Sequence, residues 1–156
     1  MGAKEFDYYI FIDYSENLIG YIIIKREKIK DCLLKISRFR HYKEARQRKL
    51  YLKKVKITFK KKNLLDYFLK KKIRNVLETP EIFADVGEFL KKNKESSIFI
   101  SVDNRQCKNF EKFVKIIDGK NVRVAKESEL KKNTFEYKIN LVLDNWLNIE
   151  RMKNMK

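Results

Sequence analysis

The chain of 156 residues is long enough for one domain with a hydrophobic core of moderate size. Hydrophobic residues make up 44% of it and aromatic residues 13%, which excludes a disordered polar tail although 38% of the residues are charged. Lysine and arginine number 38 against 21 acids, a formal net charge of +17, so we expect an anionic partner.

Almost all of this charge lies between Lys25 and Lys72, which hold 20 basic and 4 acidic residues, a net charge of +16. Heat-adapted proteins are also rich in lysine, but they gain acids at the same time, and this segment does not. A membrane surface is an alternative anion, but nucleic acid is the commonest, because neutralised phosphates release condensed counterions. We therefore expect DNA or RNA to bind this segment, with seven residues as the main contacts: Arg38, Arg40, Arg46, Arg48, Lys53, Lys54 and Lys56.

The cysteines and the apolar runs bear on the compartment. Cys32 and Cys107 are far apart and match no zinc spacing, as expected for thiols in a reducing compartment. No signal-peptide pattern precedes Phe6, and no apolar run approaches the roughly 20 residues of a membrane span. We therefore expect a cytoplasmic protein that does not enter a membrane.

The first part of the chain predicts three strands and one long helix. Residues 8–13 are aromatic and β-branched and end at a polar cluster, which predicts a strand. Residues 18–24 predict a second strand, joined to the first by a short hairpin. Apolar residues at helical spacing predict a helix over 27–50, and alternation predicts a third strand over 51–59.

The second part alternates helices and strands. Helices are predicted over 62–78 and 81–93, divided at Pro80, and later over 108–117 and 134–152. A buried strand is predicted over 97–102 and a short one over 122–125. Three early strands followed by this alternation indicate an α/β fold, a mixed sheet with helices on both faces.

Two aspartates terminate strands that are predicted to be buried, Asp13 and Asp103. Ligands of an α/β sheet gather at the carboxyl ends of its strands, so the two side chains would meet if the strands are parallel neighbours. Carboxylates so close repel each other unless a cation lies between them, and Mg²⁺ or Mn²⁺ prefers such oxygen ligands. A metal centre of this kind can support phosphodiester cleavage.

Three short motifs in this order resemble the RNase H-like superfamily of nucleases, integrases and transposases. They are Asp13-Tyr14-Ser15, Asp103-Asn104 and Leu143-Asp144-Asn145-Trp146-Leu147. A less characterised branch with D-E-S-G at the first strand and A-D-L in the last helix is also similar. The resemblance implies a five-stranded sheet with strands 1–3 antiparallel and strands 4 and 5 parallel, a single domain over 1–156, and Asp13, Asp103 and Asp144 as metal ligands and catalytic acids.

The chain departs from this family in three respects. The link over 25–49 is much longer than a tight hairpin, so we expect a basic helical insertion between strands 2 and 3. Tyr14 stands where the family has glycine. The family's second acid has no unique match: Glu81, just after Pro80, is the preferred catalytic candidate and Asp85 the next.

The environment of Asp144 has two interpretations. It lies opposite the main apolar stripe of the last predicted helix, as a solvated acid would. However, Leu141 and Leu147 flank it on its own side, as they would flank a partly buried acid that needs a partner.

The functional hypotheses follow from the charge and the acids. His41 is the only histidine, so no Ser-His-Asp set can be assembled, and the four glycines form no phosphate-binding loop. A metal-dependent nuclease using Mg²⁺ or Mn²⁺ is the first hypothesis. A non-catalytic DNA- or RNA-binding module and a ribonucleoprotein subunit on the same fold remain open.

Overall fold

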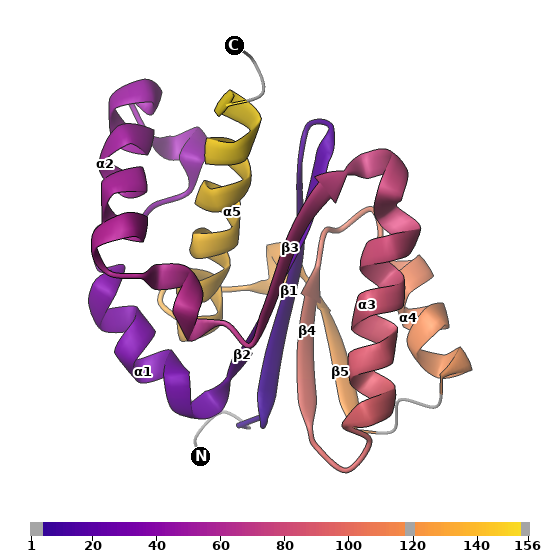
Figure 1. Cartoon of the computed structure of the whole chain (residues 1–156). Coiled ribbons are helices and arrows are strands. Elements are labelled where there is room, and N and C mark those ends of the chain that lie inside the picture. Colours follow the sequence, from indigo (N-terminus) through magenta and orange to yellow (C-terminus); the bar gives the residue numbers. More distant parts are fainter. Residues whose placement is uncertain (1–4, 118–120, 154–156) are drawn as a thin grey trace.

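A mixed five-stranded sheet lies at the centre of the computed structural model, which describes residues 5–117 and 121–153 (Figure 1). Its strand order is β3-β2-β1-β4-β5. The pairs β1–β2 and β2–β3 are antiparallel, and β1–β4 and β4–β5 are parallel, which confirms the predicted topology. The strands are β1 (Tyr8–Ser15), β2 (Leu18–Lys25), β3 (Lys70–Asn75), β4 (Ile98–Val102) and β5 (Val122–Lys126).

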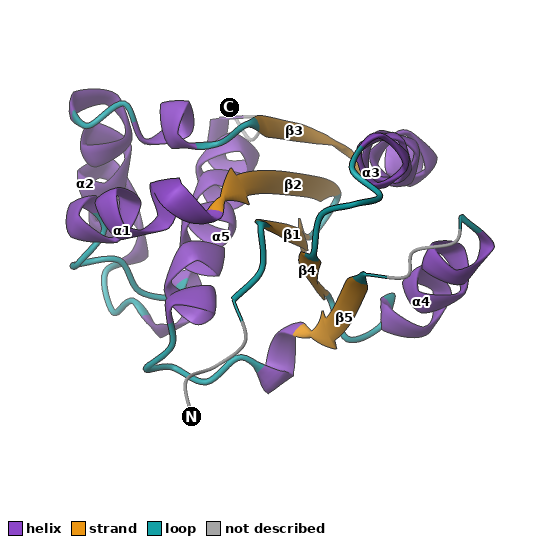
Figure 2. Cartoon of the chain, turned by 90° about the horizontal axis from the view of Figure 1, so that it is seen from below, coloured by secondary structure: helices purple, strands orange, loops and turns teal. Residues whose placement is uncertain are grey.

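Helices cover both faces of the sheet, as predicted (Figure 2). α5 packs on one face against β1 and β2, and α1 and α2 pack against the outer side of α5, while α3 and α4 cover the other face. No helix in the described part of the chain is long and apolar enough to cross a bilayer. The helices are α1 (Arg26–Lys35), α2 (Arg48–Lys61), α3 (Thr79–Lys92), α4 (Cys107–Ile116) and α5 (Phe135–Lys153).

Side chains of β1 alternate between two cores. Tyr9 and Phe11 pack in the core beneath α5, whereas Ile10 and Ile12 pack in the core beneath α3 and α4. A strand covered on both faces buries every residue, which is why β1 reads as a continuous apolar run. Each fully buried side chain of this size contributes about 1.5–3 kcal/mol, so the pattern fixes the register of the central strands.

The predicted third strand over 51–59 is wrong, because these residues lie in α2, and the helix predicted over 62–78 is wrong, because it contains β3. Leu52 and Val55, three residues apart, are the buried residues of α2, so its period is helical. β3 is an edge strand that begins with three lysines, and such a strand carries little apolar signal. Charged edge strands resist pairing with other chains.

The predicted basic insertion between strands 2 and 3 is present, but it extends over residues 26–69 and contains two helices rather than one. The single helix predicted over 27–50 ends at Lys35, and an irregular segment with a short 3-10 helix, Tyr42–Glu44, leads to α2. Because the insertion packs on α5, that helix is enclosed between the sheet and the insertion, and Asp144 is only 6% exposed. The solvated interpretation of Asp144 is therefore wrong.

Candidate metal centre

Three carboxylates stand side by side at the carboxyl edge of the parallel strands. The register pairs Ile12 of β1 with Val102 of β4, so Asp13 and Asp103 are the next residues on neighbouring strands. Val102 in turn pairs with the last residue of β5, which makes Glu127 the next residue on the third strand. Strand ends in this register bring their side chains to one edge.

The alternation of the strands also directs these three acids to the same face. In β1, Tyr9 and Phe11 belong to the core beneath α5, and Asp13 continues their period of two. Phe99 and Ala125 belong to the same core, and Asp103 and Glu127 lie an even number of residues beyond them. All three carboxylates therefore point to the α5 side of the sheet.

The oxygens of the cluster converge. One carboxylate oxygen from each of Asp13, Asp103 and Glu127 lies within 4.8 Å of the others. Asp13 is 5% exposed, and the other two are half-buried. Hard divalent cations take several carboxylate oxygens in this manner, so the donor set suits Mg²⁺ or Mn²⁺.

Electrostatics support a cation at this point. Burial raises the pKa of Asp13 well above its usual range, and the neighbouring charges of Glu127 and Asp144 raise it further, while the Tyr14 N–H, 2.8 Å from Asp13 Oδ1, opposes the shift. Burial likewise raises the pKa of Glu127, and the neighbouring charges of Asp103 and Asp144 raise it further, while the charge of His41 opposes the shift. Carboxyl groups this close do not both ionise without a compensating positive charge, and a divalent cation supplies one.

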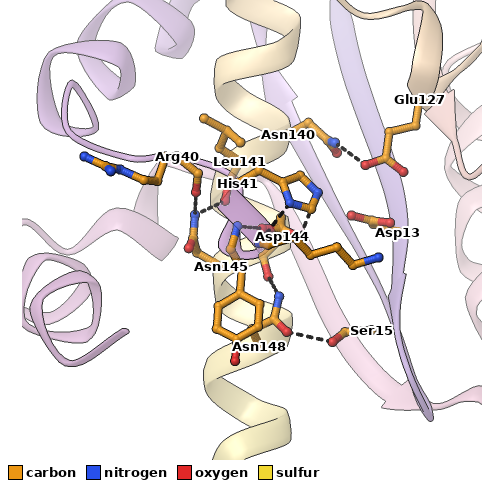
Figure 3. A network of polar contacts seen from close by, with 12 residues as sticks. Asp13, Ser15, Arg40, His41, Glu127, Asn140, Leu141, Asp144, Asn145 and Asn148 are labelled. Carbon is orange, nitrogen blue, oxygen red and sulfur yellow. Dashed lines mark hydrogen bonds and ion pairs between the residues drawn. The ribbon is translucent and has the colours of Figure 1, made fainter. Parts of the chain in front are cut away.

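Asp144 lies in the same pocket but is held by the insertion (Figure 3). Its Oδ2 accepts a hydrogen bond of 2.8 Å from the Tyr42 N–H, and its Oδ1 is 3.4 Å from His41 Nε2. Burial raises the pKa of Asp144, whereas His41, the Tyr42 N–H and Lys43 act to lower it. The structure thus brings Asp13, Asp103 and Asp144 together, with Asp144 also anchoring the insertion.

The four acids and Glu16 line a pocket of about 290 Å³ together with several basic residues. Two arginines are held against the Tyr42 ring, with Arg48 Cζ 5.4 Å and Arg151 Cζ 5.6 Å from its centroid. Arg105 Nε lies 3.4 Å from a carboxylate oxygen of Asp103. Carboxylates at the base and cations on the wall suit a metal ion together with an anionic group such as a phosphate. The basic residues that line the pocket are His41, Lys43, Arg48, Arg105 and Arg151.

Glu81 and Asp85 are not among the residues that line this pocket. Glu81 pairs with Arg74 at 2.8 Å, and Asp85 pairs with Lys72 at 2.5 Å, on β3. Asp85 also accepts a 2.9 Å hydrogen bond from the hydroxyl of Tyr21, which belongs to the core beneath α3. These two acids join α3 to the edge strand instead of joining the carboxylate cluster.

Glu127 is the acid that sequence reasoning missed. The signal was the one that identified Asp13 and Asp103, an acid at the predicted end of a strand, although β1 in fact continues past Asp13 to Ser15. The fifth strand was predicted to end at Ala125, but it ends at Lys126, directly before Glu127. Behind Glu127, the buried Asn140 of α5 donates a hydrogen bond of 3.2 Å from Nδ2 to Glu127 Oε1. Asn140 Oδ1 is buried without a hydrogen-bond partner among the described residues. A buried donor of this kind orients a ligand carboxylate.

The predicted nucleic-acid contacts fall in three places. Arg48 lies in the carboxylate pocket. Lys53 and Lys56 line a hollow between α2 and the end of α5. The remaining four line a groove of about 650 Å³ between α2 and the segment that precedes it: Arg38, Arg40, Arg46 and Lys54.

The strand order, the helices on both faces and the acids at the carboxyl edge of the parallel strands define an RNase H-like fold. No protein-family model and no curated protein matches the sequence. Among solved structures, the chain is similar to ribonuclease H2 from Pyrococcus horikoshii OT3, with a TM-score of 0.51 and 18% identity over 95% of this chain and 74% of that one. It is also similar to a chain in the PCNA:RNase HII complex from Archaeoglobus fulgidus, with a TM-score of 0.51 and 8% identity over 97% of this chain and 75% of that one. These similarities show the fold.

Proposed function

We propose that this protein is a divalent-metal-dependent nuclease that hydrolyses phosphodiester bonds in nucleic acid. The observation that carries the proposal is the convergence of Asp13, Asp103 and Glu127, whose oxygens lie within 4.8 Å of one another at the ends of three parallel strands. The chain carries a net charge of +17, yet three of its acids meet at this point and repel one another. A bound cation compensates for this electrostatic repulsion.

In this proposal Asp13, Asp103 and Glu127 hold Mg²⁺ or Mn²⁺, and Asp144 is the further candidate ligand. Held by these residues, a divalent metal would supply an activated water and positive charge near the leaving oxygen. Asn140 fixes the orientation of Glu127 through its 3.2 Å hydrogen bond.

The chain's own cations bind the substrate in this proposal. Arg48 and Arg151, both held against Tyr42, bind and orient a phosphate at the pocket. The basic insertion binds the rest of the nucleic acid backbone through the residues predicted from the sequence: Arg38, Arg40, Arg46, Arg48, Lys53, Lys54 and Lys56.

A cleavage assay tests the proposal. Labelled single-stranded, duplex and hybrid substrates are incubated with wild type, Asp13→Asn and the control Asp31→Asn, an exposed acid of α1, in Mg²⁺, Mn²⁺ or EDTA. We expect metal-dependent cleavage by wild type and the control and none by Asp13→Asn. Cleavage that survives both EDTA and Asp13→Asn contradicts the proposal.

A non-catalytic nucleic-acid-binding module is the second candidate. The observation that favours it is Asp144, which the family resemblance assigns to the metal but whose two oxygens face Tyr42 N and His41 Nε2 of the insertion. Salt-dependent binding of the same substrates, without cleavage in either metal, supports this candidate over the nuclease.

A further inference from the structure

One segment of the insertion, residues 38–48, separates the carboxylate pocket from a second hollow. His41, Tyr42, Lys43 and Arg48 of this segment line the pocket. The groove of about 650 Å³ is lined by residues 38–40 and 45–47 of the segment, together with α2, and Glu44 lines neither hollow. The segment thus contributes residues to both the carboxylate pocket and the groove, and it is called the wall below.

This wall is anchored at several points (Figure 3). Besides the bond from the Tyr42 N–H to Asp144, the Arg40 carbonyl accepts a hydrogen bond of 3.1 Å from Asn145 Nδ2 of α5. The Tyr51 hydroxyl of α2 accepts from the Arg40 N–H at 2.7 Å and donates to the Arg40 carbonyl at 2.8 Å. Because both neighbouring helices hold the segment, the groove is preformed.

The chemistry of the groove combines a basic rim with an apolar floor. Among the described residues no acid lines the groove, and four cations do, called its rim here: Arg38, Arg40, Arg46 and Lys54. Four apolar and aromatic side chains also line the groove and are called its floor here, with Leu50 47% exposed: Phe39, Leu50, Tyr51 and Val55. A duplex keeps its bases paired inside and presents mainly phosphates, so it gains little from such a floor. An unpaired strand presents base faces to the floor and phosphates to the rim.

The path between the two sides bends around the start of α2. A shallow hollow lined by residues 45–50 shares Arg48 with the carboxylate pocket and shares Ala45, Arg46 and Leu50 with the groove. A ligand that occupies both must turn around this end of the helix. Duplex DNA has a persistence length of about 50 nm, so a turn over this short distance costs a duplex several kcal/mol, whereas a flexible single strand turns at a much lower cost.

We infer that the protein binds single-stranded nucleic acid, with bases against the apolar floor of the groove and the backbone bent around the start of α2 toward the carboxylates. That this bend delivers a phosphodiester for cutting rests on the proposed nuclease function. The binding preference does not, so it is measured separately from cleavage.

Fluorescence anisotropy in EDTA tests the inference, because no metal-dependent cleavage occurs there. The probes are labelled 20-nucleotide single strands of DNA and RNA, the matching DNA duplex and the DNA–RNA hybrid, at several salt concentrations. We expect single strands to bind at least about tenfold more tightly than the duplexes. In Arg38→Gln/Arg46→Gln this preference falls by about tenfold, whereas the control Lys112→Gln/Lys115→Gln on α4, with the same change of charge, keeps it.

Leu50→Asn tests the contribution of the apolar floor to binding separately from that of the basic rim. Leu50 is 47% exposed in the groove, so this variant folds, keeps the salt dependence of binding and binds single strands several-fold more weakly. The inference is overturned if duplexes bind as tightly as single strands or more tightly. It is also overturned if the rim and floor variants behave like the α4 control. If the protein prefers single strands but does not cleave them, the inference stands and the proposed nuclease function is wrong. If it binds a duplex more tightly and cleaves it, the nuclease function stands and the inference is wrong.

Discussion

Replacing Asp13 by asparagine removes a negative charge from the centre of the carboxylate cluster while preserving its shape. At an effective dielectric constant of about 20, two ionised groups at the 4.8 Å limit of this cluster repel by about 3.5 kcal/mol. Protonation relieves part of that repulsion in the wild type. We therefore expect Asp13→Asn to raise the free energy of unfolding in EDTA at pH 7 by about 1–3 kcal/mol.

The pH dependence follows from the raised pKa of Asp13, which burial and the charges of Glu127 and Asp144 cause. The folded protein keeps a proton at pH values where the unfolded chain, with an aspartate pKa of about 3.9, has released it. Stability of the wild type therefore falls as pH rises from that value through the folded pKa and levels off above it. In Asp13→Asn the loss of stability with rising pH is smaller. Part of it remains because the pKa values of Glu127 and Asp144 are also raised.

Urea unfolding measures this effect, with the fluorescence of Trp146, the only tryptophan, as the signal, between pH 5 and 8 in EDTA. Asp31→Asn is the matched control, since substitutions of exposed residues usually change stability by less than about 0.5 kcal/mol. Mg²⁺ at 100 times its Kd stabilises the wild type by about 2.7 kcal/mol, and Asp13→Asn loses most of this gain. A variant more than about 1 kcal/mol less stable than wild type at pH 7, or a wild type that gains stability toward pH 8, refutes the reasoning.

Further substitutions test the other acids and Asn140. Glu127→Gln lowers Mg²⁺-dependent cleavage at least about 100-fold, and Glu95→Gln, an exposed control, does not; a wild-type rate removes Glu127 from the centre. Asn140→Leu weakens Mg²⁺ binding about 10–100-fold by calorimetry, because Glu127 loses its buried donor; unchanged affinity makes Asn140 a packing residue. Asp85→Asn lowers stability by about 1 kcal/mol without changing cleavage, because Lys72 loses its charged partner while the amide oxygen still accepts from Tyr21; slower cleavage at unchanged stability returns Asp85 to the site.

Much of the fold could be predicted from sequence because its central strands carry strong local signals. β1, β2 and β4 are apolar runs that end at polar residues, and their buried positions match the prediction. The same reasoning placed Asp13 and Asp103 at strand ends. The hairpin and the alternation that follows it were enough to predict the mixed sheet.

Sequence patterns failed to identify the elements that bury few side chains. β3 is half-exposed at the sheet edge and rich in lysine, and α2 buries only two residues among its basic ones, so neither shows a clear period. The local pattern in α2 happened to match a strand, and only pairing with β2 identifies Lys70–Asn75 as the third one.

The sequence by itself determined the basic insertion and the acids at the ends of the first and fourth strands. Only the tertiary structure decided which acids meet, because Asp13, Asp103 and Glu127 are separated by 90 and 24 residues and converge only when β1, β4 and β5 align in register. It also decided the environment of Asp144, since a helix reads as solvated on its outer side until another element covers it. Local patterns encode the period of an element; long-range packing determines what each of its faces meets.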